Sequence, residues 1–116
     1  MTSHEIQARL RMYRFDLSSE DKTQQGIAAA LTIAGIAFQR EVPLTKKDRL
    51  DFLIDGIALE VKLEGGRAAL LRQLLRYAEH PEVRELMVFT SRRRLTLLPP
   101  LISGKSLTVC YVFPLH

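Results

Sequence analysis

The chain of 116 residues predicts one α/β domain, in which helices flank a mixed central β-sheet in the order αβββαβ, with an extra C-terminal strand. Three observations support this prediction. Asp55-Gly56 joins two stretches of alternating apolar residues, as in a tight β-hairpin. A helical pattern follows over 67–79, and a continuous apolar run at 86–89 indicates a strand buried on both faces. A strand, a crossover helix and a buried strand together form a right-handed βαβ unit.

The N-terminal residues 1–17 are expected to form a basic arm or helix. Ile6, Leu10 and Tyr13 recur at helical spacing among arginines. A solvated helix that covers the edge of the domain explains this pattern. Contact between these arginines and a phosphate backbone is the alternative.

A second helix is expected to begin at Ser18 or Ser19, either of which can cap its first turn, and to end at Gly35. Its apolar stripe, followed backwards at helical spacing, leads to Gln24 and then to Glu20. This placement can deliver the Glu20 carboxylate to a site at the edge of the sheet. The alternative is a favourable charge near the positive end of the helix dipole.

The remaining elements complete the predicted sheet. Residues 36–44 form its first strand and residues 107–113 its last. The domain therefore divides into an N-terminal arm, a core at 18–91 and a C-terminal extension at 92–116. The helix at 67–79 has one apolar face, which consists of Leu71, Leu74, Leu75 and Ala78.

The predicted hairpin places two acidic residues face to face. With the turn at Asp55-Gly56, Asp51 lies opposite Glu60, and strand alternation puts Lys62 on the same face. Opposed like charges destabilise a sheet. A divalent cation, a raised carboxyl pKa, or Lys62 lying diagonal to Asp51 can each offset this repulsion. The other face is apolar and is expected to be a core layer made of Leu50, Phe52, Ile54, Ile57, Leu59, Val61 and Leu63.

Two converging carboxylates with a backbone carbonyl between them form a hard oxygen site suited to Mg²⁺ or Mn²⁺. Such a cation polarises a phosphate oxygen and lowers the pKa of a bound water, which becomes the nucleophile. Lys62 can orient this water or stabilise charge that develops on the phosphate. The alternative is a wet outer sheet face with a diagonal ion pair of little energetic consequence.

The motif Glu60-Val61-Lys62 follows Asp51 on the next predicted strand. This pattern lies after a helix with an acidic residue and before a helix on a mixed sheet. It resembles the PD-(D/E)XK superfamily of restriction-endonuclease-like nucleases over most of the chain. The pattern is closest to the VRR-type and Holliday-junction-resolvase-like branches. Leu50 stands where the superfamily's name has proline, a departure that many active members share.

This resemblance implies a role for each matching position. Asp51 and Glu60 would bind the metal, with help from the Val61 carbonyl. Lys62 would be the activating base or the electrostatic partner of the reacting phosphate. Glu20 would match the acidic residue that many members carry on the first helix, as a further catalytic residue.

A polar pair on the later helix also takes part in the resemblance. Gln73 and Tyr77, one turn apart, are similar to the pair that these two branches place beside the site. Gln73 is thus a candidate catalytic residue and Tyr77 a candidate contact to nucleic acid. The alternative for Tyr77 is simple packing at the edge of the helix.

The net charge of +4 and the pI of about 9.6 fit a polyanionic partner. With the resemblance, they predict an endonuclease that cuts DNA, including branched or structured DNA, with Mg²⁺ or Mn²⁺ as cofactor. A homodimer is expected, because one site cuts one strand. The rival is an inactive nuclease-like fold that binds nucleic acid or another protein. The candidate nucleic-acid contacts are Arg49, Arg67, Tyr77, Arg92, Arg93 and Arg94.

The sequence also indicates an intracellular, cytoplasmic protein with no membrane segment. Its apolar runs are too short to span a bilayer, and charged residues stand where a signal peptide would need its apolar region. Cys110 is the single cysteine and cannot form an internal disulfide. It is expected to be a small buried hydrophobe.

Overall fold

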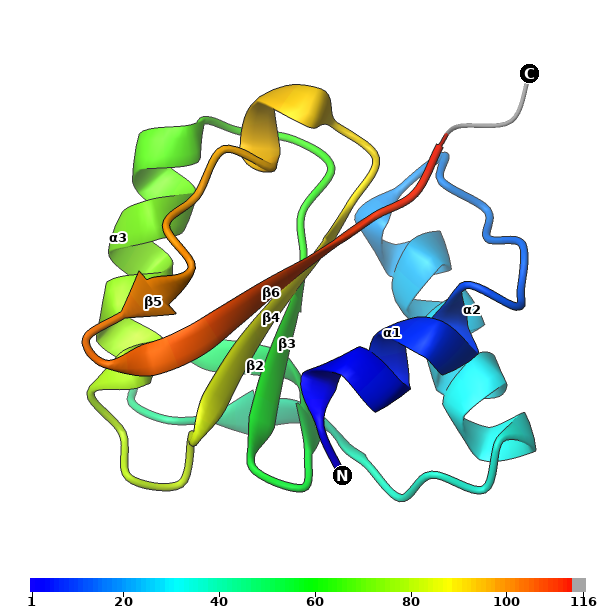
Figure 1. Cartoon of the computed structure of the whole chain (residues 1–116), viewed down its shortest axis with the longest axis horizontal. Helices are drawn as coiled ribbons and strands as arrows, with labels where there is room; N and C mark the ends of the chain where they lie inside the picture. Colours follow the sequence, from blue (N-terminus) through cyan, green and yellow to red (C-terminus); the bar gives the residue numbers. More distant parts are fainter. Residues whose placement is uncertain (114–116) are drawn as a thin grey trace.

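The computed structural model describes residues 1–113 and confirms a mixed β-sheet flanked by helices (Figure 1). The expected helices and strands all occur, with ends that differ by a few residues. A short 3₁₀ helix, η1, and a two-residue strand, β5, are additional. The elements are α1 (Ser3–Leu10), α2 (Glu20–Ile33), β1 (Gln39–Pro43), β2 (Arg49–Ile54), β3 (Ile57–Val61), α3 (Arg67–Ala78), β4 (Glu85–Thr90), η1 (Arg93–Leu95), β5 (Leu101–Ile102) and β6 (Lys105–Tyr111).

The six strands lie in the order β1-β2-β3-β4-β6-β5. Strands β1, β2 and β3 pair in antiparallel fashion, whereas β3, β4 and β6 run parallel to one another. Parallel neighbours need a crossover connection, which α3 supplies between β3 and β4. The carboxyl ends of the three parallel strands therefore meet at one edge of the sheet.

The hairpin between β2 and β3 has the predicted register. Ile54 pairs with Ile57, and the two turn residues, Asp55 and Gly56, have φ angles of 49° and 76°. These positive angles define the primed turn that an Asp-Gly pair favours. A Cβ at Gly56 would also lie 3.0 Å from the Arg84 side chain, so a larger residue would crowd Arg84 as well as strain the turn.

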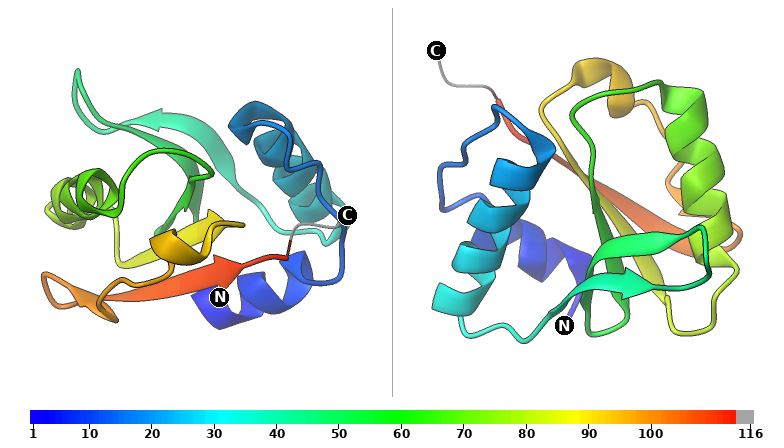
Figure 2. Two further views of the ribbon diagram at one scale, coloured as in Figure 1. Left: turned by 90° about the horizontal axis from the view of Figure 1, so that it is seen from above. Right: turned by 180° about the vertical axis from the view of Figure 1, so that it is seen from behind.

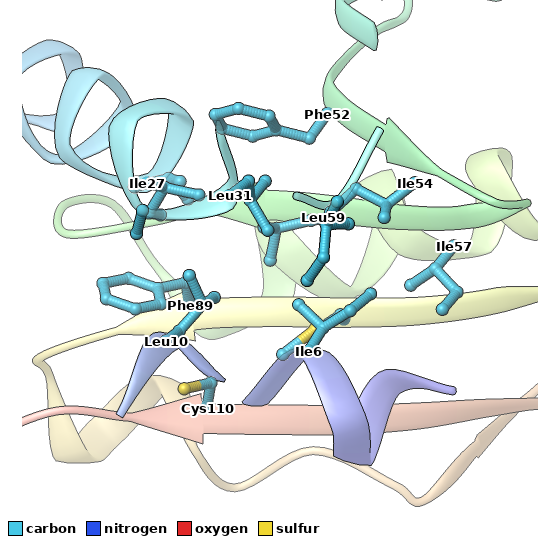
Figure 3. Close-up of a cluster of buried hydrophobic side chains, with 14 residues drawn as sticks. Ile6, Leu10, Ile27, Leu31, Phe52, Ile54, Ile57, Leu59, Phe89 and Cys110 are labelled. Atoms are coloured by element: carbon cyan, nitrogen blue, oxygen red, sulfur yellow. The ribbon is translucent and has the colours of Figure 1, made fainter. Parts of the chain in front are cut away.

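The sheet is buried on both faces, as Figure 2 shows from above. Helices α1 and α2 cover one face, and Figure 3 shows the apolar cluster beneath them. Helix α3 covers the other face with a second cluster. Strand β4 contributes Met87 and Phe89 to the first cluster and Leu86 and Val88 to the second, which confirms a strand buried on both faces. Cys110 lies in the first cluster, fully buried.

Two helices differ from the sequence prediction in what they bury. Ile6 and Leu10 of α1 are fully buried, so this helix adds side chains to the core, while its outer residues His4, Glu5, Ala8 and Arg9 are exposed as expected of a covering helix. On α3, Tyr77 and Leu70 are fully buried, whereas Leu75 is 40% exposed. The α3 stripe is therefore rotated relative to the predicted one, because a tyrosine with bonded hydroxyl takes a core position.

Strand β2 separates from β3 a few residues after the turn. The ladder between them ends at the pair Phe52–Leu59, whereas β2 pairs with β1 as far as Arg49. Figure 2 shows β1 and β2 running across the direction of β3. Leu50, which was expected in the layer with Phe52, packs in the α3 cluster instead. The prediction was wrong for Leu50 because the faces of β2 turn once the strand leaves β3.

Candidate active site

Asp51 and Glu60 lie in the fork where β2 and β3 separate. Counted from the turn, the last pair of the ladder is Phe52–Leu59, and Asp51 and Glu60 are the next residues on the two strands. Asp51 Oδ2 accepts a hydrogen bond of 2.8 Å from the Val61 N–H. The Asp51 carboxylate thus holds a backbone amide of β3 in place of a strand partner, at the carboxyl edge of the parallel strands.

The Glu60 carboxylate is buried beneath α3, with 5% of the residue exposed. Its Oε1 lies 3.2 Å from the Tyr77 hydroxyl, which is also 3.0 Å from the Arg49 carbonyl oxygen. Gln73 Nε2 donates to the same hydroxyl over 2.7 Å. A hydroxyl has one proton and two lone pairs. The Tyr77 hydroxyl therefore either donates its hydrogen bond to ionised Glu60, or accepts a hydrogen bond from neutral Glu60 and donates to the Arg49 carbonyl oxygen.

Burial and neighbouring carboxylates raise the pKa values of both acids. Burial raises the pKa of Asp51 more than the Val61 amide lowers it, and the Glu41 carboxylate raises it further. Burial likewise raises the pKa of Glu60, and the Asp51 carboxylate adds to this effect. The Lys62 ammonium lowers the pKa of both acids, but less than burial raises it. A nearby cation would reverse this balance.

One oxygen of each carboxylate is open. No donor within residues 1–113 bonds Asp51 Oδ1 or Glu60 Oε2. Every fully buried side-chain nitrogen or oxygen in this part of the chain has a partner, so these two oxygens must contact solvent. Such oxygens suit a hard cation. The described residues contain no group of three or more His, Cys, Asp or Glu placed to hold a metal, so a cation here would also need the Val61 carbonyl and water.

Lys62 follows β3 directly, and its N–H donates to the Phe89 carbonyl over 3.0 Å. This bond extends the contact between β3 and β4 beyond the strand end. The Lys62 ammonium makes no salt bridge with Asp51 or Glu60 within 4.0 Å. The diagonal ion pair considered from the sequence is therefore not formed, and the residue Lys62 as a whole is partly exposed.

Glu20 binds backbone amides at the start of the loop that follows β3. Its Oε2 accepts hydrogen bonds from Leu63 N–H and Glu64 N–H over 3.0 and 3.3 Å. Ser19 caps α2 by accepting from Lys22 N–H, which fixes the first turn that carries Glu20. The sequence predicted that the Glu20 carboxylate reaches the edge of the sheet, and its observed position agrees with this. The carboxylate holds the loop next to Lys62.

The arginines after β4 hold the same loop from its other side. Arg92 Nε donates to the Leu63 carbonyl over 2.9 Å, and Arg94 Nη2 donates to the Gly65 carbonyl over 3.0 Å. In the loop at 62–66, the Glu20 carboxylate thus binds backbone amides, and the side chains of Arg92 and Arg94 bind backbone carbonyls. The sequence did not suggest this arrangement, because it gave these arginines no partner within the chain.

The other candidate contacts to nucleic acid have different surroundings. Arg49 and Arg93 are exposed, and Arg67 is exposed but bonds the Leu97 carbonyl through Nη1 over 3.2 Å. Tyr77 is fully buried, so its hydroxyl serves Glu60 and has no surface from which to contact nucleic acid. The structure therefore groups Tyr77 with Gln73 as a support of the carboxylates.

Comparison of this chain with family models, with curated proteins and with solved structures finds no match. None of the helices in residues 1–113 combines the length and the apolar character needed to cross a bilayer. The fold is thus assigned to the α/β class with a mixed sheet. The function has to be argued from the geometry of the site.

Proposed function

We propose that this protein is an endonuclease that depends on Mg²⁺ or Mn²⁺ and hydrolyses phosphodiester bonds in DNA. The supporting observation is the fork of β2 and β3. There, Asp51 and buried Glu60 have raised pKa values and open oxygens beside an ammonium without a salt bridge. A structural ion pair would instead have placed Lys62 against a carboxylate. Acids whose pKa values are shifted by burial and by a neighbouring charge are candidates for a functional site.

Each residue has a distinct part in this proposal. Asp51 and Glu60 would hold the cation with the Val61 carbonyl, and the cation supplies a Lewis acid and an activated water. Lys62 would stabilise negative charge on the phosphate, since the residue is partly exposed and its ammonium is close enough to lower the pKa of both acids. Glu20 positions Lys62 through the adjacent loop.

Tyr77 and Gln73 are proposed as positioning residues for Glu60. The Tyr77 hydroxyl is fixed by the Arg49 carbonyl and by Gln73, so it restrains the direction of the Glu60 carboxylate. Ligands held by outer hydrogen bonds keep the orientation that a metal requires. Gln73 would therefore act on Glu60 indirectly, by holding the Tyr77 hydroxyl.

The proposal is tested by cleavage of plasmid and branched DNA with Mg²⁺ or Mn²⁺. Asp51→Asn and Lys62→Ala should each lower the rate by at least about 100-fold, since each removes a group that acts on the reacting phosphate. Glu79→Gln and Lys47→Ala change exposed residues of the same types and should leave the rate unchanged. Equal cutting by all four variants would assign the activity to a contaminant.

A separate measurement distinguishes catalysis from binding alone. In a thermal unfolding experiment without DNA, Mn²⁺ should raise the Tm of the wild-type protein and not that of Asp51→Asn. DNA binding with neither cleavage nor a Mn²⁺ effect would favour the rival, a nuclease-like fold that only binds nucleic acid. Absence of DNA binding as well would favour a protein-interaction module.

The same proposal includes a homodimer in the cytoplasm. Two sites are needed to cut both strands in one encounter. Sedimentation of the purified protein at micromolar concentration should give the mass of two chains. A single-chain mass with retained double-strand cutting would show that dimer formation is unnecessary.

A further inference from the structure

Two neighbouring hollows lie at the carboxyl end of β6, and aromatic side chains separate them. One, of about 300 Å³, is lined by the segment between α1 and α2 and by the end of β6. The other, of about 570 Å³, is lined by η1 and its flanking residues and by the same end of β6. Tyr111 and Phe113 line both hollows. Volumes of this size accommodate a small planar ligand.

Of the aromatic pair between the hollows, Phe113 is exposed and Tyr111 is partly exposed. The rings of Tyr111 and Phe113 are 5.1 Å apart at an interplanar angle of 72°. Phe113 is 68% exposed, and Tyr13 and Phe15 line the smaller hollow from the opposite side. An exposed phenylalanine beside further aromatic rings offers faces on which flat groups can stack.

The borders of the hollows are positively charged. Arg11 and Arg14 line the smaller hollow, and Arg93 and Arg94 line the larger one. All four are exposed, and no acidic side chain is among the described residues that line either hollow. Arginines around aromatic faces form a site for groups that combine phosphate charge with a planar ring.

The hollows share a sheet edge with the proposed catalytic residues. Val61 pairs with Phe89 across β3 and β4, and the next residue of β4, Thr90, pairs with Tyr111 of β6. Tyr111 thus lies two strand spacings from the end of β3, or about 10 Å. Figure 1 shows η1 and the end of β6 at the same end of the molecule as the start of α2. One or two nucleotides span such a distance.

We propose that this pair of hollows, here called the aromatic cleft, binds unpaired nucleotides of a DNA strand next to the site of hydrolysis. Bases stack on Tyr111 and Phe113, and the four arginines contact the phosphates. A base in a duplex is already stacked on its neighbours, so only unpaired nucleotides can use these ring faces. This inference rests on the proposed function for the reaction that the cleft serves, but the binding itself requires no metal.

The test is DNA binding by the full chain in EDTA, followed by fluorescence anisotropy. The probes are a labelled oligothymidine of about 12 nucleotides and a duplex of equal length. The wild-type protein should bind the single strand more tightly than the duplex. Phe113→Ala should weaken single-strand binding about 5- to 30-fold, as expected for the loss of one stacking partner. Arg93→Ala should lower the salt dependence by about one phosphate contact.

Two matched variants serve as controls. Ile33→Ala removes an apolar side chain of α2 that is 72% exposed, and Arg72→Ala removes an exposed arginine of α3. Both should bind the single strand within about twofold of wild type. Equal effects of Phe113→Ala and Ile33→Ala, or a preference for the duplex, would overturn the inference.

Asp51→Asn separates this inference from the proposed function. It should bind the single strand as wild type does while losing cleavage. If the wild-type protein binds through Phe113 but never cleaves DNA, the aromatic cleft is upheld and hydrolysis is rejected. If Asp51-dependent cleavage occurs but Phe113→Ala binds and cleaves normally, hydrolysis is upheld and the aromatic cleft is rejected.

Discussion

Asp48 and Glu60 are the two buried carboxylates of residues 1–113, and both bond to side chains of α3, yet their partners differ. The two Asp48 carboxylate oxygens share the N–H of Arg76 Nε, at 3.0 and 3.1 Å. Glu60 has the Tyr77 hydroxyl and no salt bridge. A buried carboxylate that is paired with a basic side chain can be explained by a structural role. A buried carboxylate with no such partner destabilises the fold unless a ligand supplies the positive charge.

The opposite layer, beneath α1 and α2, contains no buried carboxylate among the described residues. Its cluster packs apolar side chains of the helices against those of the strands, as Figure 3 shows. The two faces of the sheet thus have different roles. One face stabilises the domain through apolar burial, and the other tolerates a polar network that positions Glu60 at the edge.

The largest effect on stability is expected in the apolar layer. Phe89→Ala should lower the free energy of unfolding by about 3–5 kcal/mol, because it removes a fully buried ring that packs against Phe15. Urea denaturation measures this loss. Ile33→Ala, at an exposed position, is the control and should change stability by less than about 0.5 kcal/mol.

The next effect concerns the pH dependence of Glu60 in the metal-free protein. Burial raises the pKa of Glu60 to about 8. Between the ordinary pKa of a glutamate and pH 8, the folded state therefore binds more protons than the unfolded state. The contribution of Glu60 to the free energy of unfolding should therefore be greatest below its ordinary pKa and be lost as the pH rises through the folded pKa. A loss of about 2–3 kcal/mol between pH 5 and pH 8 is expected. Thermal unfolding in EDTA measures it.

Two substitutions sharpen this comparison of the buried acids. Glu60→Gln should remove most of the pH dependence and stabilise the metal-free protein at pH 8. Asp48→Asn should instead destabilise it by about 1 kcal/mol, because Arg76 loses its charged partner. The same sign of effect for both substitutions would show that the two acids do not differ in the way proposed.

A smaller effect is expected for the hydroxyl that supports Glu60. Tyr77→Phe keeps the buried ring but leaves Gln73 Nε2 and the Arg49 carbonyl without this partner. The expected cost is about 1–2 kcal/mol of stability. Mn²⁺ binding, measured by calorimetry, should also weaken about 10-fold, since Glu60 is no longer held in position. Unchanged Mn²⁺ affinity would limit Tyr77 to a role in stability.

Much of the site was predictable because local rules determine it. The Asp55-Gly56 turn sets the register, and the register in turn places Asp51 beside β3 and Glu60 beneath α3. The extension of the α2 stripe to Glu20 followed from helical period alone. These predictions needed only residues close in the sequence. The structure confirms the register as far as Phe52–Leu59 and places Glu20 at the loop after β3, whereas the direct pairing of Asp51 with Glu60 and the chemistry stay predictions.

Long-range packing explains what the sequence did not reveal. The burial of Tyr77 depends on the Arg49 carbonyl, 28 residues away. The bonds from Arg92 and Arg94 to the loop after β3 join segments that are 29 residues apart. The turning of β2 that moves Leu50 to the α3 layer begins only where its pairing with β3 ends. No periodicity in a single segment contains this information.

The smallest expected effect concerns the loop that Glu20 holds. Glu20→Ala removes a charged acceptor shared by Leu63 N–H and Glu64 N–H, and Arg92 retains the loop through the Leu63 carbonyl. Global stability should therefore fall by only about 1 kcal/mol, while the two amides exchange with solvent about 10-fold faster. Hydrogen exchange measured by NMR tests this, with Glu79→Gln as control. If exchange is unchanged but cleavage is lost, Glu20 acts on the metal or the phosphate directly. It would then be a catalytic residue and not a positioning residue.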